Sequence, residues 1–344
     1  MIKHKVLIVG TGSVGRRHIE NLLRLGTEVL TYSYRREPRS DPWRDKVRVF
    51  DSLDAAFSAA PDAVVVANRT DQHLDVALRG ARDGRALFIE KPLSHSLQGV
   101  DELLRESEMR SLVVESGFML RLHPNLVWLR QFLEAGELGE PFYCRACVGQ
   151  YLPEWRPTED YRASYSASAT CGGVIFDLIH ELDLVAWLFG PIEAAQAMTA
   201  RTKALEIESE AIAQIGLRSA SGLVAQVHMD YVRPVYARTL EVVGSRGIVS
   251  WDYVQGTIVL TTPNGGARTA HAVPDGFVRN DLFLAHMRHF LTRIDDRLVA
   301  PVSSLADGIF ALRMALACRQ SAAEGRLVRP AGITTAVSFA SASS

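Results

Sequence analysis

A glycine-rich turn near the N-terminus constrains the fold more than any other feature of this sequence. It follows the apolar run Val6–Val9 directly and reads Gly10, Thr11, Gly12, Ser13, Val14, Gly15, a G-x-G-x-x-G pattern. The first glycine permits a tight turn, the second lets a pyrophosphate approach the backbone, and the third allows close packing of helix on strand. The helical pattern that follows, Ser13–Leu25, presents its N-terminal N–H groups to phosphate. The turn therefore predicts a dinucleotide-binding βαβ unit, with a purely structural glycine turn as the alternative.

Up to Gly117 the chain alternates short apolar runs with helical patterns. The apolar runs are Val6–Val9, Val29–Thr31, Val47–Phe50, Ala63–Ala67, Ala86–Ile89 and Leu112–Val114, and the further helical patterns include Asp71–Asp83 and Leu97–Glu108. Strands that alternate with helices form parallel sheets, and continuous apolar strands indicate helices on both faces. We therefore expect a six-stranded, doubly wound parallel sheet.

Beyond residue 122 the pattern changes to closely spaced strands. Strand-like runs are Phe142–Tyr151, Ala194–Ala200, Ala211–Leu217, Leu223–Tyr231, Arg238–Val243, Ile248–Trp251 and Thr257–Leu260, and predicted helices are Asn125–Ala135, Val174–Phe189, Asn280–Asp295 and Ser304–Glu324. Closely spaced strands with glycine turns indicate an antiparallel α+β domain. We expect domains at residues 1–122 and 123–330, followed by a flexible tail at 331–344.

Charge and cysteine content narrow the class of protein. The 344 residues include 38 Lys and Arg against 39 Asp and Glu, a formal charge of −1. The chain therefore lacks the excess of positive charge that attracts a nucleic acid backbone. Hydrophobic residues make up 47% without an apolar stretch of membrane-spanning length, so we expect no membrane partner. The four cysteines indicate a reducing compartment and the N-terminus lacks the features of a signal peptide, so we expect a cytoplasmic protein.

The end of the second predicted strand bears on the choice of cofactor. NAD enzymes usually carry an acidic residue there to bond the ribose 2′-hydroxyl. Here Ser33, Arg35 and Arg36 stand at the strand end and are suited to a 2′-phosphate, whereas Glu37 comes slightly late and would have to loop back. The sequence thus favours NADP over NAD, unless both arginines are ordinary surface charges.

Two further motifs carry candidate proton-handling groups. Glu90, Lys91 and Pro92 follow the fifth predicted strand, at the sheet edge where ligands bind, and a lysine there can donate a proton or stabilise an oxyanion. Asp177 and His180 lie three residues apart in the predicted helix Val174–Phe189, so we expect them on one helical face, where Asp177 would hold the His180 tautomer or bind a substrate hydroxyl. A structural hydrogen-bonded cluster is the alternative.

Together these motifs resemble the glucose–fructose oxidoreductase / inositol dehydrogenase / MocA (Gfo/Idh/MocA) family. Thr70 and His73 form a T-x-x-H, and the segment from Gly117 to Pro124 is similar to the family's entry into its second domain. The resemblance implies an α/β fold: an N-terminal Rossmann domain, then an α+β domain whose large, open, mainly antiparallel sheet commonly mediates dimers or tetramers. It also implies hydride transfer between nicotinamide and a sugar, nucleotide sugar or cyclitol.

The resemblance also implies roles for single residues. Lys91 and His180 would handle the proton with help from Asp177, and all three would contact substrate. Asn68, Arg69, Thr70, His73 and Glu90 would lie along the cofactor. Two departures stand out: many members place the aspartate four residues before the histidine rather than three, and Met119 occupies a position that is often polar.

A loop rich in aromatic residues supplies further candidates for substrate binding. Trp155, Arg156 and Tyr161 precede the Asp177–His180 segment and are suited to covering a nicotinamide or contacting a polyol, and we also expect Arg121 to contact substrate. A lid that packs without selecting substrate is an equal alternative.

Other chemistry is less well supported. Cys144 and Cys147 form a C-x-x-C without a second ligand pair and would face opposite sides of a strand, so we expect no metal site. We interpret His286 and His289 as structural residues on a surface helix. A non-catalytic sensor, or an enzyme that recycles a tightly held NAD(H) for net non-redox sugar chemistry, remains an alternative to a dehydrogenase.

Overall fold

The N-terminal domain is built around a six-stranded parallel sheet. The computed structural model describes residues 4–34, 41–155 and 160–330. The sheet has the strand order β3-β2-β1-β4-β5-β6. Its strands are β1 (Lys5–Val9), β2 (Glu28–Tyr32), β3 (Arg48–Phe50), β4 (Ala63–Val66), β5 (Ala86–Ile89) and β6 (Val114–Ser116), and its helices are α1 (Ser13–Arg24), α2 (Leu53–Ser58), α3 (His73–Arg82) and α4 (Val100–Met109). The doubly wound sheet expected from the sequence is confirmed, with β6 shifted by two residues and the short α2 not foreseen.

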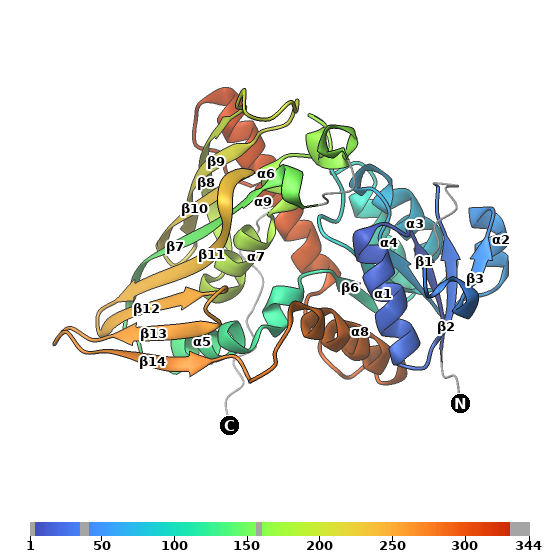
Figure 1. Cartoon of the computed structure of the whole chain (residues 1–344), viewed down its shortest axis with the longest axis horizontal. Helices are drawn as coiled ribbons and strands as arrows, with labels where there is room; N and C mark the ends of the chain where they lie inside the picture. Colours follow the sequence, from blue (N-terminus) through green and yellow to red (C-terminus); the bar gives the residue numbers. More distant parts are fainter. Residues whose placement is uncertain (1–3, 35–40, 156–159, 331–344) are drawn as a thin grey trace.

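Each face of this sheet packs on a different set of helices. Alternate residues of the buried strands, such as Leu7 and Val9, belong to the core shared with α3 and α4. Their neighbours Val6 and Ile8 pack on α1 and on α8 (Arg279–Asp295) through a second apolar cluster. Figure 1 shows α8 beside α1, although the two helices are far apart in the sequence. One face of the N-terminal sheet is therefore covered in part by a helix from the C-terminal part of the chain.

The C-terminal domain has an eight-stranded sheet in the order β14-β13-β12-β11-β7-β10-β9-β8. Its strands are β7 (Pro141–Tyr151), β8 (Ile192–Ala200), β9 (Ile212–Ser219), β10 (Val224–Asp230), β11 (Val232–Gly244), β12 (Gly247–Asp252), β13 (Thr257–Thr261) and β14 (Ala267–Ala272), and its helices are α5 (Pro124–Glu134), α6 (Val174–Asp177), α7 (His180–Phe189) and α9 (Leu305–Glu324). Pairing is antiparallel except between β7 and β10. The mainly antiparallel sheet is confirmed, and β14 was not foreseen.

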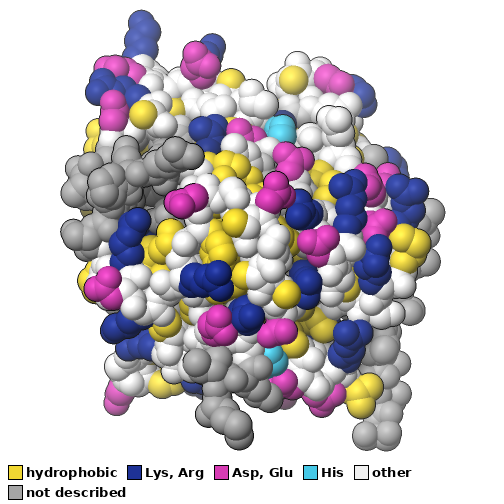
Figure 2. Space-filling view, turned by 90° about the vertical axis from the view of Figure 1, so that its right-hand side faces the viewer, with side chains coloured by type: hydrophobic (Ala, Val, Ile, Leu, Met, Phe, Trp, Pro, Cys, Tyr) yellow, Lys and Arg dark blue, Asp and Glu magenta, His cyan; other side chains and the backbone are white. Residues whose placement is uncertain are grey.

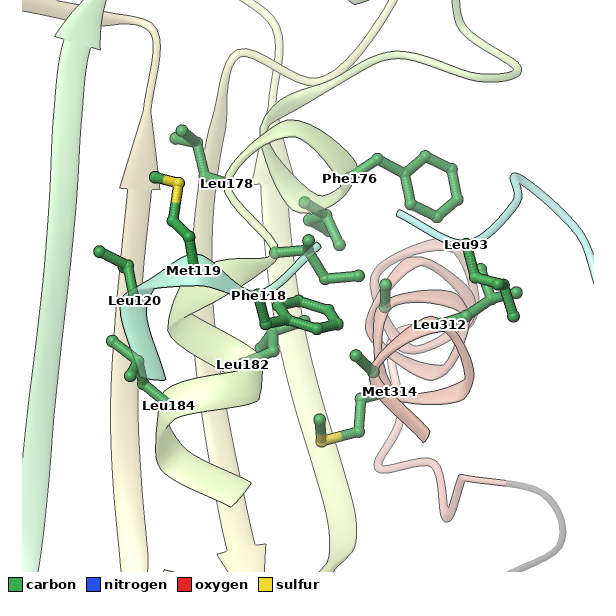
Figure 3. Packing of buried hydrophobic residues seen from close by; sticks show 14 of the residues in the cluster. Leu93, Phe118, Met119, Leu120, Phe176, Leu178, Leu182, Leu184, Leu312 and Met314 are labelled. Atoms are coloured by element: carbon green, nitrogen blue, oxygen red, sulfur yellow. The ribbon is translucent and has the colours of Figure 1, made fainter. Parts of the chain in front are cut away.

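The two domains share one apolar core. Figure 3 shows Leu182 of α7 and Met314 of α9 packing near Phe118, which follows β6. All three side chains are buried. Because α7 begins at His180 and β5 is followed by Lys91, this packing holds the two residues in a fixed relation across the domain boundary.

Helix α8 is not the surface helix that the sequence suggested for His286 and His289. His286 is buried rather than on the surface, because α8 packs on the sheet, and its Nε2 lies 3.4 Å from Glu115 Oε2. His289 is less buried and bonds the Ala300 carbonyl at 2.9 Å. Both histidines hold α8 in place.

The face of the molecule in Figure 2 shows no strong charge bias. On the face in Figure 2, basic and acidic side chains are interspersed and no single sign dominates. Within the described ranges, no helix combines the length and the hydropathy that crossing a bilayer requires.

Candidate functional site

The three glycines of the N-terminal turn have three different surroundings. Gly10 has φ +101°, and a Cβ there would strike the Ala67 carbonyl. A Cβ on Gly15 would overlap the Gly10 carbonyl oxygen, because α1 passes close to the turn. A Cβ on Gly12 would meet no heavy atom within 4 Å. Gly10 and Gly15 are therefore required by the protein's own packing, whereas Gly12 faces open space, as a cradle for a ligand does.

A cavity of about 700 Å³ extends from this turn to the end of β5. It brings together most of the residues expected along the cofactor: Gly10, Thr11, Gly12, Ser13, Val14, Ser33, Asn68, Arg69, Thr70, His73, Glu90 and Lys91. Tyr34, Asp41, Asp51 and Tyr165 also line it. Arg35 and Arg36, and the alternative Glu37, lie outside the described residues.

The segment after β4 is braced against the end of β5. The buried His73 ring lies 2.9 Å from the Pro92 carbonyl through Nδ1 and 3.1 Å from the Asn68 carbonyl through Nε2. Burial lowers the pKa of His73. Asn68 donates from Nδ2 to the Gln72 carbonyl, whereas its buried Oδ1 has no partner among the described residues. This unsatisfied acceptor and the open space at Gly12 fit a hydrogen-bonding ligand such as a dinucleotide.

Lys91 and Glu90 line the end of the cavity that lies next to β5. The Lys91 ammonium donates to the backbone carbonyl of Asp177 at 2.6 Å, and burial lowers its pKa from the ordinary 10.5. The Glu90 carboxylate accepts from His18 Nε2 at 2.6 Å. Burial opposes ionisation of Glu90, but the contact with His18 outweighs it and lowers the pKa. Lys91 is therefore held from both sides, by the β5 end and by the C-terminal domain.

The expected continuous helix carrying Asp177 and His180 is broken. α6 ends at Asp177, Leu178 departs from helical geometry with φ −102° and ψ 25°, and α7 begins at His180. Asp177 and His180 therefore do not share one helical face, and no hydrogen bond joins them among the described residues.

The Asp177 carboxylate instead faces the C-terminal sheet. Its Oδ2 accepts from Ser166 Oγ and from the Tyr231 hydroxyl, each at 2.6 Å. Ser166 and Tyr231 were missed in the sequence, since no motif marks them and the only signal is the position of Tyr231 at a strand end. Asp177 thus braces the site with its side chain and holds Lys91 with its backbone.

His180 is buried at the start of α7. Its ring makes an edge contact with Phe118, with centroids 5.7 Å apart. Burial, and then the charge of Lys91, lower its pKa well below the ordinary value. Its buried Nδ1 has no partner among the described residues. The imidazole is therefore neutral near pH 7.

The other expected substrate contacts differ in position. Trp155 makes an edge contact with the ring of Tyr231 at 5.4 Å, and the Tyr161 hydroxyl accepts from the Glu206 N–H at 3.4 Å. Arg156 lies outside the described residues. Trp155 therefore lies next to Tyr231, which bonds Asp177, whereas Tyr161 contacts the segment between β8 and β9.

Arg121 does not contact the cavity, contrary to the expectation that it would contact substrate. Its guanidinium is buried and donates to both carboxylate oxygens of Asp183, at 2.6 and 3.0 Å, and to Asp307 at 3.1 Å. These bonds occupy most of its donors, so Arg121 ties η3 (Met119–Leu122) to α7 and α9 in the core.

The two cysteines of the C-x-x-C pattern both lie on β7. Cys144 and Cys147 are free, and the β7 registers show that they face opposite sides of the sheet, with Cys144 buried. No cluster of potential metal ligands occurs among the residues that the structure describes.

The glycine turn, the cavity and the lysine at its end define a dinucleotide-binding site of the Rossmann type. A model described as "Oxidoreductase family, NAD-binding Rossmann fold" matches residues 4–118, and the "GFO/IDH/MocA C-terminal domain" matches residues 126–250. The chain belongs to the Gfo/Idh/MocA family of oxidoreductases, and its N-terminal domain is an NAD-binding Rossmann domain.

Named relatives span nearly the whole chain. A myo-inositol 2-dehydrogenase of Thermotoga maritima is 28% identical, covering 94% of this chain and 98% of the relative. An inositol 2-dehydrogenase of Rhizobium meliloti is 27% identical over 93% and 97% of the two chains. The solved UDP-N-acetylglucosamine 3-dehydrogenase of Acidithiobacillus ferrooxidans has a TM-score of 0.78 at 23% identity, covering 93% of this chain and 98% of that one, and supports the fold.

Proposed function

We propose that this protein transfers a hydride between a nicotinamide cofactor and a hydroxyl-bearing carbon of a sugar, nucleotide sugar or cyclitol. The observation that carries the proposal is the cavity that begins at the glycine turn and ends at Lys91. The ammonium of Lys91 stands there on the Asp177 carbonyl, and the neutral His180 lies in the same segment. The names of the relatives point to the same class of substrate.

The chain's own residues would bind the cofactor along the cavity. The N–H groups at the start of α1 would bind the pyrophosphate, and the Asn68 Oδ1, which has no partner among the described residues, would accept a hydrogen bond further along. When bound, the nicotinamide ring accepts or donates the hydride.

Lys91 and His180 are the proposed proton-handling residues. During oxidation the substrate hydroxyl loses a proton to Lys91, whose lowered pKa increases the fraction of neutral amine. The Asp177 carbonyl orients the amine, and the carboxylate of Asp177 is itself held by Ser166 and Tyr231. A neutral His180 would donate or accept a hydrogen bond at the same hydroxyl.

We further propose a preference for NADP over NAD. Ser33 lines the cavity just beyond β2, where an NAD enzyme usually presents a carboxylate. Ser33→Asp would add that carboxylate, so it should weaken NADPH binding and strengthen NADH binding. Fluorescence titrations of the unchanged protein and of Ser33→Asp with NADPH and with NADH test the preference. Tighter NADH binding by the unchanged protein would contradict it.

The C-terminal sheet is the proposed surface for self-association into dimers or tetramers. No described helix covers its outer face (Figure 1). The strand registers put Tyr143, Val224 and Met198 on that one face, and all three side chains are exposed, Met198 by 73%. Sedimentation of the purified protein tests this self-association. We also propose that the two domains meet near residue 122 and that the protein is cytoplasmic.

Activity is tested by assaying sugars and cyclitols for cofactor-dependent turnover. We expect NADPH or NADH to change in proportion to product. Turnover without net change of cofactor would contradict the dehydrogenase and favour the recycled NAD(H), and failure to bind either cofactor would favour the sensor.

A further inference from the structure

A group of three arginines near the proposed proton-handling residues lies outside the lining of the cofactor cavity. We name Arg17, Arg238 and Arg279 the arginine cluster; none of them lines the cofactor cavity. Arg17 and Arg279 both lie over the ring of Phe283, with guanidinium carbons 4.8 and 5.8 Å from its centroid. They come from α1 and from the first residue of α8, two helices that Figure 1 shows side by side.

This pair of arginines is linked to the end of β5. The Phe283 ring also makes an edge contact with the imidazole of His18, at 5.8 Å. That imidazole bonds the Glu90 carboxylate, and Glu90 precedes Lys91. Arg17 and Arg279 are therefore connected to the proposed catalytic lysine through Phe283, His18 and Glu90.

Arg238 approaches from the C-terminal sheet. It is buried on β11, and its Nε lies 2.7 Å from Glu181 Oε1. Glu181 follows His180 at the start of α7. Two residues before Arg238, the ring of Tyr236 packs edge-on against Tyr253 with centroids 6.0 Å apart. Arg238 therefore lies next to the start of α7, paired with Glu181.

The cluster holds more positive charge than its neighbours neutralise. Arg238 has Glu181 as a partner, but Arg17 donates to the neutral amide oxygen of Asn280, at 3.3 Å. The Arg279 side chain is accessible to solvent and, among the described residues, has no carboxylate within ion-pair distance. Neighbouring atoms nevertheless displace part of its water, and this partial desolvation, then the charge of Arg238, lower the pKa of Arg279. Gathered cations without acidic partners are costly unless an anion joins them.

The influence of Arg279 extends to the reacting groups. Its positive charge contributes to the lowered pKa of both Lys91 and His180, after larger effects from burial. The contacts that lead from Arg279 through Phe283 and His18 to Glu90 point the same way, so an anion bound at Arg279 would lie on the Lys91 side of the site.

We propose that Arg279, supported by Arg17 and Arg238, binds an oxyanion carried by the sugar substrate, either a carboxylate or a phosphate. A guanidinium binds both groups through two parallel hydrogen bonds. This inference rests on the proposed function and narrows it: the enzyme selects an acidic sugar or a nucleotide sugar over a neutral sugar or cyclitol.

The test compares neutral and anionic sugars on the cofactor-loaded protein. Isothermal titration of the NADPH-saturated enzyme uses D-glucose against D-glucuronate, and N-acetylglucosamine against UDP-N-acetylglucosamine. The first pair tests a carboxylate and the second a phosphate. We expect the anionic member of at least one pair to bind more tightly, by roughly 10- to 100-fold, as charged hydrogen bonds contribute.

Substitutions assign the effect to Arg279. Arg279→Gln should abolish the preference for the anion, and Arg279→Lys should retain part of it because the charge remains. Arg288, exposed further along the same helix, provides the matched control, since Arg288→Gln removes the same charge outside the cluster. If no anionic sugar binds better than its neutral parent, or if Arg279→Gln binds like the unchanged protein, the inference is wrong. Loss of NADPH and NADH binding by the unchanged protein would refute the proposed function instead.

Discussion

Replacing Gly12 with alanine should weaken cofactor binding while leaving the fold intact. Gly12 has an ordinary φ of −69° and precedes α1, and a Cβ there meets nothing within 4 Å. Alanine is a poorer residue than glycine before a helix, at a cost below about 1 kcal/mol. The added methyl group occupies the space in which the pyrophosphate approaches the backbone. We therefore expect roughly 10- to 100-fold weaker binding, as for an overpacked site.

Gly15→Ala is the matched comparison within the same turn. Its Cβ would overlap the Gly10 carbonyl oxygen and lie 2.9 Å from the carbonyl carbon. Because both atoms belong to the backbone, α1 must move away from the turn. Overpacking of this kind costs about 1–3 kcal/mol, which lowers the melting temperature by roughly 2–4 °C for each kcal/mol in a large domain. Gly15→Ala should therefore lose stability as well as cofactor affinity.

Thermal unfolding and fluorescence titration with NADPH and NADH, measured on both variants, separate the two effects. The reasoning is refuted if Gly12→Ala binds cofactor as tightly as the unchanged protein. It is equally refuted if Gly12→Ala lowers the melting temperature as much as Gly15→Ala does.

Three further perturbations follow from the site and the core. Lys91→Met should lower kcat by roughly 10²-fold with cofactor affinity retained, and unchanged turnover would exclude Lys91 as the proton acceptor. Because burial lowers the pKa of Lys91 from 10.5, the rate of oxidation should rise with pH below that value as the amine loses its proton, and the limb should vanish in Lys91→Met. Tyr231→Phe removes a donor from the buried Asp177 carboxylate and should cost about 1–3 kcal/mol in urea unfolding; no change would mean that the brace is dispensable. Arg121→Leu leaves Asp183 buried and unpaired, so it should destabilise the fold by about 3–5 kcal/mol, and an effect on substrate affinity alone would contradict its structural role.

The sequence alone determined the N-terminal fold and most of the cofactor cavity. Continuous apolar strands and the glycine turn act over a few neighbouring residues, and parallel connections bring strand ends to one edge of the sheet. For this reason Gly12, Ser33 and Lys91 were predicted together and line one cavity, and Asn68, which only the family resemblance suggested, lines it too.

Tertiary packing decided how the second domain meets that cavity. Periodicity predicted one helix over Val174–Phe189, but the break at Leu178 turns the Asp177 carboxylate toward Tyr231 and its carbonyl toward Lys91. No local pattern announces such a break, because its partners lie far away in the sequence.

The same limit applies to the charged residues. Arg121 and Arg279 look alike in the sequence, yet one is enclosed by two carboxylates and the other stands without one among the described residues. Residue type sets what each guanidinium can bind, but the long-range docking of α7, α8 and α9 sets which groups surround it. The chemistry available to this protein was therefore readable from its sequence, whereas the assignment of each charge to core or site was decided only when distant elements packed together.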